Sequence, residues 1–316
     1  MRAVFLDLET LDDLDLTPLE RVVDELVCYP HTTPEQVAER IAGFDVVVTN
    51  KTGLTAEHMA AAEGLQLICV AATGVNNLDL AMARSLGITV CNAQGYGTRS
   101  VAQHVITLIM ALHTRLLDYD RAVRNGDWNR TDQFCLLDYP IIEVSGRTLG
   151  IIGYGTLGQA VAQQAQALGM KVLVAARPGE PASEGRLPFA QLLEQVDVLS
   201  LHCPLTEQTR NLIDAAALAR MKPGSFIVNA ARGGIVNEEA LAAALRSGHL
   251  GGAATDVLSV EPPREGNPLL DPSLPNLIVT PHCAWGSREA RETIIRQLAE
   301  NIQAFRDGAP RRCVNL

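Results

Sequence analysis

The chain has 316 residues, of which 47% are hydrophobic, 20% charged and 4% aromatic. A chain of this length buries a large core and exceeds the size at which one core usually divides, so we expect two domains. Its 26 basic and 36 acidic side chains give a formal net charge of −10, without any block rich in Lys and Arg. This acidic balance argues against nucleic acid and anionic membranes as partners.

The N-terminal segment and the cysteines bear on the compartment. The first twenty residues are rich in acids, whereas an export signal needs a basic start and an apolar core. The seven cysteines form an odd set without a Cys-x-x-Cys pair, which predicts neither a disulfide framework nor a zinc site. We therefore expect a cytoplasmic protein without a metal.

Short apolar runs alternate along the chain with longer segments of helical periodicity. This alternation is typical of α/β layers with parallel strands. Residues 125–147 interrupt it with turn formers and aromatics, so we expect a connection packed on a surface or against another subunit. The expected strands cover residues 3–6, 46–49, 67–71, 149–152, 172–175, 198–201, 226–229 and 278–280, and the clearest helices 101–117, 157–168 and 238–246.

The first chemical signal is a glycine-rich turn that follows a predicted strand. Residues 148–158 read TLGIIGYGTLG and continue into a helical run. Strand, Gly-x-Gly-x-x-Gly turn and helix form the dinucleotide-binding unit, whose glycines let the backbone approach the pyrophosphate. The helix N-terminus adds unpaired N–H groups and a positive dipole end. Although glycines also mark ordinary turns, we predict cofactor contacts from Gly153, Gly155, Thr156, Leu157 and Gly158.

The end of the next strand bears on which dinucleotide is bound. An acid at this point would bind the ribose 2′-hydroxyl of NAD, but the sequence has Ala176 and Arg177 there. An arginine can pair with the 2′-phosphate of NADP, so we expect NADP(H) to be preferred over NAD(H). The alternative is that Arg177 is a solvated loop residue.

Three further signals lie at expected carboxyl ends of strands, where open α/β sheets bind ligands. Arg232 precedes two glycines and can bind a carboxylate through two parallel hydrogen bonds. Glu261 and His282 offer the acid and the imidazole of a proton-transfer pair. Singly, Arg232 could cap a helix or form a surface ion pair, Glu261 could be a solvated charge, and His282 could be a core histidine with its hydrogen bonds satisfied. Together with a dinucleotide turn, they indicate an oxidoreductase that acts on a carboxylate substrate.

Seven segments resemble the D-isomer-specific 2-hydroxyacid dehydrogenase family, in the family's order and over nearly the whole chain. The variant SVAQH at 100–104 and the segment FCLLDY at 134–139 are most similar to the glycerate dehydrogenase/hydroxypyruvate reductase branch. Gln103 departs from the acid that many members carry. The seven segments are 71–79 (AATGVNNLD), 95–104 (GYGTRSVAQH), 150–158 (GIIGYGTLG), 202–206 (HCPLT), 229–233 (NAARG), 256–262 (DVLSVEP) and 281–285 (PHCAW).

The resemblance implies an α/β protein with two Rossmann-like, doubly wound parallel-sheet domains. The substrate-binding (catalytic) domain is discontinuous and flavodoxin-like, formed by residues 1–98 and 287–316. The NAD(P)-binding Rossmann domain, residues 99–286, is inserted into it, and the active site is the cleft. The resemblance also implies a homodimer whose cofactor domains pack together. For the segment that carries Trp128 and Phe134, two alternatives stay open: it covers the neighbouring subunit's site or the substrate pocket.

The resemblance further implies a role for each site residue. Hydride passes between C4 of the nicotinamide and C2 of the substrate, His282 is the acid/base, Glu261 hydrogen-bonds His282, and Arg232 holds the substrate carboxylate and carbonyl. Asp256 lies near the nicotinamide carboxamide. The remaining implied contacts are Lys51, Thr73, Gly74 and Val75 to the substrate, and Thr98, Cys203, Pro204, Thr209 and Ala230 to the cofactor.

The expected activity is that of a glycerate dehydrogenase/hydroxypyruvate reductase, with a small 2-hydroxy or 2-keto acid as partner. Within oxidoreductases the alternatives are a glyoxylate or broader 2-ketoacid reductase, or a dehydrogenase for phosphite or another small anion, because pocket shape decides among them. In a different class, a dinucleotide-sensing binding protein would keep the fold without the chemistry.

Overall fold

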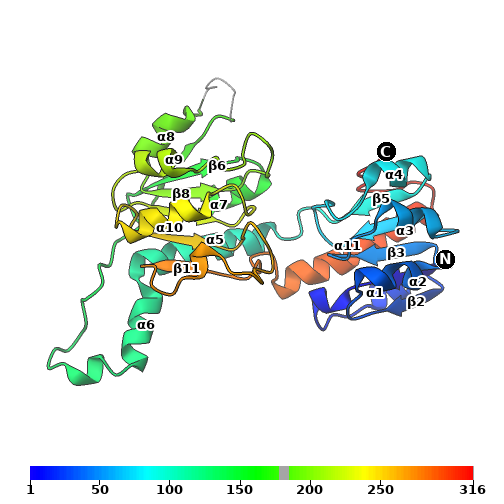
Figure 1. The fold of residues 1–316 in the computed structure, drawn as a ribbon, viewed down its shortest axis with the longest axis horizontal. Helices are drawn as coiled ribbons and strands as arrows, with labels where there is room; N and C mark the ends of the chain where they lie inside the picture. Colours follow the sequence, from blue (N-terminus) through cyan, green and yellow to red (C-terminus); the bar gives the residue numbers. More distant parts are fainter. Residues whose placement is uncertain (178–184, 316) are drawn as a thin grey trace. The chain divides into compact units, whose positions relative to one another are not determined.

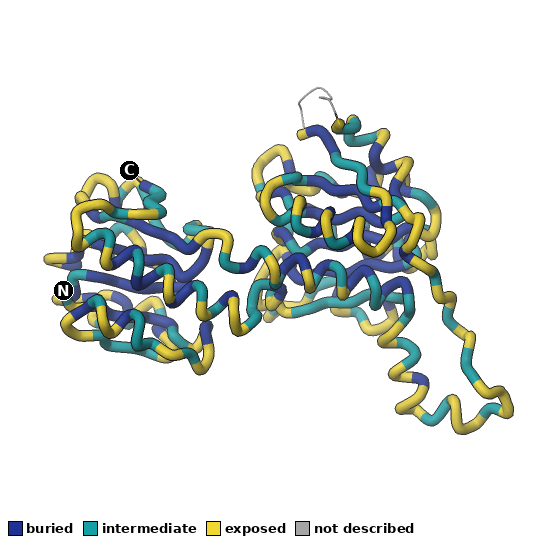
Figure 2. Tube along the Cα trace, turned by 180° about the vertical axis from the view of Figure 1, so that it is seen from behind, coloured by how far each residue is buried: buried dark blue, intermediate teal, exposed yellow. Residues whose placement is uncertain are grey.

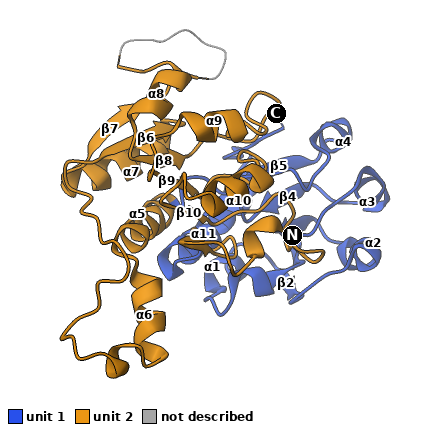
Figure 3. Cartoon of the chain, turned by 60° about the vertical axis from the view of Figure 1, so that its left-hand side comes forward, with its two compact units in different colours: residues 1–97, 286–316 blue, residues 98–285 orange. Residues whose placement is uncertain are grey.

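The computed structural model describes residues 1–177 and 185–315 and forms two compact units (Figures 1 and 3). Unit 1 comprises residues 1–97 and 286–316, and unit 2 comprises residues 98–285. Both boundaries lie one residue from the limits expected for the two domains. Leu316, which ends the expected substrate domain, lies outside the described residues.

Unit 1 is built on a parallel sheet with the strand order β2-β1-β3-β4-β5. All residues of β3 and β4 are buried, which explains their continuous apolar runs. Helix α11 comes from the C-terminal part of the chain and packs on β4. The elements are β1 (Arg2–Phe5), η1 (Leu8–Leu11), α1 (Thr17–Glu20), β2 (Glu25–Cys28), η2 (Pro34–Gln36), α2 (Val37–Ile41), β3 (Val46–Thr49), α3 (Ala56–Ala61), β4 (Leu67–Val70), α4 (Leu80–Ser85), β5 (Thr89–Asn92) and α11 (Arg288–Arg306).

Unit 2 is built on a second parallel sheet, with the order β11-β10-β9-β8-β6-β7. Its elements are α5 (Thr98–Thr114), α6 (Leu116–Arg124), η3 (Trp128–Arg130), β6 (Thr148–Ile152), α7 (Thr156–Ala167), β7 (Lys171–Val174), α8 (Phe189–Gln195), β8 (Val198–Leu201), α9 (Ala215–Arg220), β9 (Phe226–Asn229), α10 (Glu238–Arg246), β10 (Gly252–Thr255), η4 (Pro268–Leu270) and β11 (Leu277–Val279).

The core of unit 2 lies on both faces of its sheet. Val198 packs in a cluster with α5 and α7, and its neighbour Leu199 packs in a cluster with α8, α9 and α10, because successive strand residues face opposite sides. Figure 2 shows the buried residues concentrated in the interior of each unit. The two parallel-sheet α/β units confirm the predicted fold class.

Several elements differ from the sequence-based expectation. The helix expected over residues 101–117 is wrong at its end, because Arg115 adopts a left-handed conformation (φ 54°) that separates α5 from α6. The short strands β2, β5 and β10 were not among the expected runs. Two of them contain polar residues and β10 is the small-residue sequence GAAT, so none is a strongly apolar run.

The connection expected at residues 125–147 holds one turn of 3-10 helix, η3, and is otherwise irregular throughout its described length. Figure 1 shows α6 and this connection extending away from the sheet of unit 2. Every helix within residues 1–177 and 185–315 is too short or too polar to cross a lipid bilayer.

Candidate active site

The glycine turn joins β6 to α7 in unit 2, and two of its glycines are required by close backbone contacts. Gly153 has φ 93°, and a Cβ there would lie 2.5 Å from the backbone N of Cys203. A Cβ on Gly158 would lie 2.2 Å from the carbonyl oxygen of Gly153. In contrast, a Cβ on Gly155 would meet no described atom within 4 Å. The turn is therefore tight against the protein on one side and open beside Gly155.

Helix α7 starts at this turn with Gly155 as its N-cap, so no side chain caps it. The first N–H groups of a helix have no partner within the helix and carry its positive dipole end. Here they belong to Thr156, Leu157 and Gly158, beside the open space at Gly155. These N–H groups and the open space beside Gly155, together named the α7 cradle, fit a pyrophosphate. The turn brings together the five residues predicted from the glycine motif.

The loop after β8 lies against the glycine turn through Cys203. Burial raises the pKa of the Cys203 thiol, which keeps it neutral. Thr209 is buried, donates from Oγ1 to the carbonyl of Pro204 (2.7 Å) and accepts from the N–H of Thr206 (2.7 Å). The Thr209 hydroxyl therefore shapes this loop.

The other predicted cofactor residues lie at ends of elements of unit 2. Arg177 is exposed just after the edge strand β7, whereas Ala176 beside it is buried. Ala230 directly follows β9, and Thr98 is the first residue of α5.

Arg232 lies on a turn that Asn229 builds at the end of β9. The Asn229 side chain accepts from the N–H of Ala231 (3.1 Å) and donates to the carbonyl of Arg232 (2.9 Å). A Cβ on Gly233 would lie 1.9 Å from the carbonyl oxygen of Leu258. Only glycine therefore lets the Arg232 turn pack against the loop that follows β10.

That loop carries Glu261, which contacts His282. His282 Nδ1 and Glu261 Oε2 are 2.6 Å apart, and both side chains are about one-third exposed. The second carboxylate oxygen, Oε1, accepts from the N–H of Leu258 (2.8 Å). The structure thus brings Glu261 and His282 together and holds the carboxylate at both oxygens.

Asp256 holds the backbone around His282. His282 has φ 53°, a left-handed conformation that a non-glycine residue keeps only when its surroundings enforce it. Its N–H donates to the carbonyl of Asp256 (2.8 Å). The buried Asp256 carboxylate accepts from the N–H groups of Cys283 (3.0 Å) and Ala284 (2.9 Å) and from the hydroxyl of Thr280 (2.5 Å). This carboxylate therefore fixes the segment that presents the histidine.

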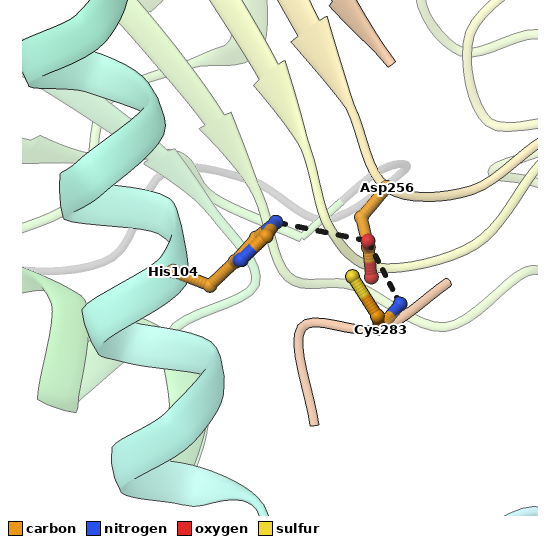
Figure 4. Close-up of side chains that lie close together, drawn as sticks. All are labelled: His104, Asp256 and Cys283. Carbon is orange, nitrogen blue, oxygen red and sulfur yellow. Dashed lines mark hydrogen bonds and ion pairs between the residues drawn. The ribbon is translucent and has the colours of Figure 1, made fainter. Parts of the chain in front are cut away.

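His104 on α5 completes a cluster with Asp256 and Cys283 (Figure 4). Because the Thr280 hydroxyl donates its proton to Asp256, it can only accept from His104 Nε2, 3.1 Å away. A protonated Nε2 has no lone pair for a metal ion. Burial, followed by the charge of Asp256, raises the pKa of the Cys283 thiol. The described contacts therefore favour a hydrogen-bonded support for the His282 segment.

In unit 1, the turn that carries Lys51 is held by a residue that the sequence did not single out. Asp7 lies two residues after the end of β1 and is 2% exposed. Its carboxylate accepts from the N–H groups of Asn50 (2.8 Å), Lys51 (2.6 Å) and Thr52 (2.7 Å). An acid at the end of an apolar run was the available signal. Asp7 thereby sets the path of the backbone on either side of Lys51.

The turn of residues 73–75 is held by the end of β5. Thr73 donates from Oγ1 to the carbonyl of Ala93 (2.9 Å), and Asn92 donates from Nδ2 to the carbonyl of Thr73 (2.8 Å). Asn92 and Asn229 were both missed as supporting residues, because an asparagine at a strand end is a common turn former.

Comparison with known proteins identifies the family. Residues 106–284 match "D-isomer specific 2-hydroxyacid dehydrogenase, NAD binding domain". The chain belongs to the D-isomer specific 2-hydroxyacid dehydrogenases. This dehydrogenase is therefore an oxidoreductase that uses a nicotinamide dinucleotide and acts on a small 2-hydroxy acid. The resemblance stated from the sequence is confirmed.

Relatives of this dehydrogenase match over its full length. It is 45% identical to a glycerate dehydrogenase of Methylorubrum extorquens over 99% of this chain and 98% of that protein. It is 38% identical to a hydroxypyruvate reductase of Blautia hydrogenotrophica over 100% of both chains. The crystal structure of the TT0316 protein from Thermus thermophilus superposes with a TM-score of 0.87 at 34% identity, covering 99% of this chain and 100% of that one.

Proposed function

We propose that this dehydrogenase is a glycerate dehydrogenase, which interconverts D-glycerate and hydroxypyruvate. The 2.6 Å hydrogen bond between Glu261 and His282, next to the Arg232 turn, is the observation that carries the chemistry. The names of the relatives from M. extorquens and B. hydrogenotrophica support this substrate.

His282 is the acid/base in this proposal. A bound nicotinamide dinucleotide supplies or accepts the hydride. With Nδ1–H donated to Glu261, His282 has Nε2 left to give a proton to the C2 oxygen on reduction and to remove it on oxidation. Glu261 is a positioning residue, because its bond to the N–H of Leu258 fixes the carboxylate that orients the ring.

Arg232 and residues of unit 1 bind the substrate in this proposal. The Arg232 guanidinium holds the substrate carboxylate through paired hydrogen bonds and stabilises negative charge on the carbonyl oxygen. Lys51 adds a positive charge. Thr73, Gly74 and Val75 offer backbone N–H groups, since a glycine-containing turn can present several donors together.

We assign cofactor binding to unit 2 and expect NADP(H) to be preferred over NAD(H). The α7 cradle binds the pyrophosphate, and Arg177 pairs with the 2′-phosphate, where Ala176 offers no carboxylate to repel it. Further contacts come from Thr98, Cys203, Pro204, Thr209, Ala230 and Asp256.

We also propose a homodimer that forms through α6 and the connection after it. Phe134 is 89% exposed, Leu137 74% and Leu116 57%, and a run of exposed apolar side chains marks an association surface. Light scattering should give the mass of a dimer for the wild-type chain. The double variant Phe134→Asp/Leu137→Asp should give the mass of a monomer, and an unchanged mass would refute this interface.

We place the enzyme in the cytoplasm. Its seven cysteines are free thiols, and thiols persist in a reducing compartment. Fractionation of cells that express the tagged chain tests this placement.

The deciding experiment measures steady-state reduction of hydroxypyruvate and glyoxylate, each with NADH and with NADPH. Efficient turnover of hydroxypyruvate with NADPH preferred is the expected result. Faster turnover of glyoxylate would make the protein a glyoxylate reductase, and dinucleotide binding without turnover of any 2-keto acid would leave a sensing protein.

The role of Arg177 needs a matched pair of variants. Arg177→Ala should reduce the preference for NADPH by about tenfold, which corresponds to the loss of one charge-assisted contact. Arg220→Ala removes another exposed arginine of unit 2 and should leave the preference unchanged. Equal cofactor preferences in wild type and Arg177→Ala would refute the 2′-phosphate contact.

A further inference from the structure

Two cysteines of unit 1 face each other across a short antiparallel contact outside the proposed site. Cys91 lies on the edge strand β5, and Cys313 lies in the segment after α11. Their sulfur atoms are 3.5 Å apart. Asn92 N–H donates to the carbonyl of Arg312 (3.1 Å), and Val314 N–H donates to the carbonyl of Val90 (2.9 Å). Cys91 and Cys313 are therefore the non-hydrogen-bonded pair between two backbone hydrogen bonds.

This position suits a disulfide. The Cα atoms of a non-hydrogen-bonded antiparallel pair are about 4.5 Å apart, within the range of about 4.4–6.8 Å found across disulfides. Closing the sulfur–sulfur distance from 3.5 Å to about 2.05 Å needs side-chain rotation without displacement of the strands. We propose that Cys91 and Cys313 form a two-electron redox site that peroxide closes to a disulfide and thiol reductants reopen.

The two thiols differ in access, which assigns their roles. Cys313 is partly exposed, whereas Cys91 is fully buried. The Cys313 thiolate attacks hydrogen peroxide, the O–O bond breaks, and Cys313 becomes a sulfenic acid as hydroxide leaves and is protonated to water. The Cys91 sulfur then attacks the Cys313 sulfur, the S–O bond breaks, and a second water leaves. Two thiols lose two electrons and two protons, and one peroxide is reduced to two waters.

The Cys91 thiol is expected to act in the slower second step. Burial, and then the neighbouring thiols, raise its pKa, and the thiolate is the attacking form. Cys313 therefore accumulates as sulfenic acid whenever Cys91 is missing.

The segment that carries Cys313 is already held in register by Asn315. The Asn315 side chain accepts from the N–H of Val90 (2.8 Å) and donates to the carbonyl of Ile88 (2.8 Å). Arg84 Nε donates to the backbone carbonyl of Asn315 (2.8 Å). Closure therefore fixes an arrangement that exists without the covalent bond. A crosslink between residues 222 positions apart also restricts the unfolded chain. Oxidation should raise the Tm by several degrees and leave turnover nearly unchanged.

The test compares the full-length protein after treatment with dithiothreitol and with hydrogen peroxide. Non-reducing peptide mass spectrometry should show Cys91 linked to Cys313, with the rise in Tm, and dithiothreitol should reverse both. A link between Cys91 and Cys69, its partner residue on β4, would overturn the proposal. So would sulfinic or sulfonic acid at Cys313 without any crosslink.

Three variants separate the pair from general oxidation. Cys313→Ser should abolish the crosslink and the Tm shift, whereas Cys28→Ser, which removes another partly exposed thiol of unit 1, should keep both. Cys91→Ala should leave a sulfenic acid at Cys313 that dimedone traps. A Tm shift that persists in Cys313→Ser would refute the assignment of Cys91 and Cys313 as the redox pair. The crosslink and the Tm shift do not depend on which 2-keto acid the enzyme reduces.

Discussion

The two units share a strand order but differ at the end of the first strand of each sheet. In both, the second strand, the first, and then the next three lie side by side in that order, so each has a switch point beside its first strand. Ligands bind at such points in open α/β sheets. After β1, unit 1 continues into Asp7 and the 3-10 helix η1. After β6, unit 2 continues into Gly153 and the longer helix α7.

This difference sets which ligand each switch point suits. In unit 1 the carboxylate of Asp7 accepts from three backbone N–H groups, so these donors already have a negatively charged partner within the protein. In unit 2 the space beside Gly155 is open, and the first N–H groups of α7 carry positive dipole charge. Topology thus locates a site, and the residues after the first strand determine its charge.

The largest expected effect separates the chemistry of unit 2 from substrate binding in unit 1. His282→Ala should lower kcat by about a hundred- to ten-thousand-fold, because it removes the proton-transfer group. Lys51→Ala should instead raise KM with a smaller change in kcat. Steady-state kinetics with hydroxypyruvate tests both, and a His282→Ala enzyme that keeps most of its turnover would refute the mechanism.

The next effect concerns His202 at the end of β8, where unit 1 has Asn50 at the end of β3. Burial lowers the pKa of His202 to about 4. Between pH 4 and pH 6.5 the histidine of the unfolded chain, with a pKa of about 6.5, binds more protons than the buried one. The free energy of unfolding therefore keeps its full value above about pH 6.5 and falls as the pH drops towards 4. The loss reaches about 3 kcal/mol at the lower limit.

Urea unfolding between pH 7.5 and pH 4.5 measures this dependence. His202→Gln keeps a side chain that can hydrogen-bond to the Ser200 hydroxyl, whose Oγ lies 2.8 Å from His202 Nε2, but glutamine cannot titrate. The variant should therefore lose less stability than wild type as the pH falls. If the free energy of unfolding fell equally with pH in wild type and in His202→Gln, His202 would not be the source of the pH dependence.

Asp7→Asn tests whether unit 1 depends on its buried carboxylate. The amide has one acceptor oxygen and adds a donor among three N–H groups, so unfolding free energy should fall by about 1–3 kcal/mol. Dinucleotide affinity, measured by fluorescence titration, should remain at the wild-type value because the cradle is in unit 2. Loss of affinity equal to that in a cradle variant would break the comparison.

Gly155→Ala makes the matching change in unit 2. Its φ of −85° suits alanine and the Cβ meets no described atom, so Tm should hardly change. Dinucleotide affinity should fall by about tenfold, or about 1.4 kcal/mol, because the methyl group enters the phosphate space. Gly158→Ala is the contrasting variant: its clash with Gly153 should lower Tm. Unchanged affinity in Gly155→Ala would place the phosphates elsewhere.

Local patterns made much of the molecule predictable. Apolar runs marked β3, β8 and β9, and periodicity marked α7 and α10, because these signals reside within a few residues of one chain segment. The short strands β2, β5 and β10 lack such a signal and form through pairing with neighbours. The break at Arg115 likewise depends on a left-handed residue that periodicity does not reveal.

The candidate site divides in the same way. The residue types and order of Arg232, Glu261 and His282, after the glycine turn, indicate hydride and proton chemistry from the sequence alone. The sequence did not reveal that Gly233 packs on the carbonyl of Leu258, or that Asp256 anchors the backbone of the histidine segment.

By itself, the sequence determined the family, the two-unit α/β class and the glycine turn, since each depends on residues close together in the chain or on the order of motifs. Only the tertiary structure decided which distant residues meet. Asp7 reaches the turn after β3, and Cys91 meets Cys313 across 222 positions. The physical reason is that strand order and helix packing create these contacts, and no local pattern encodes the neighbour that a side chain will find.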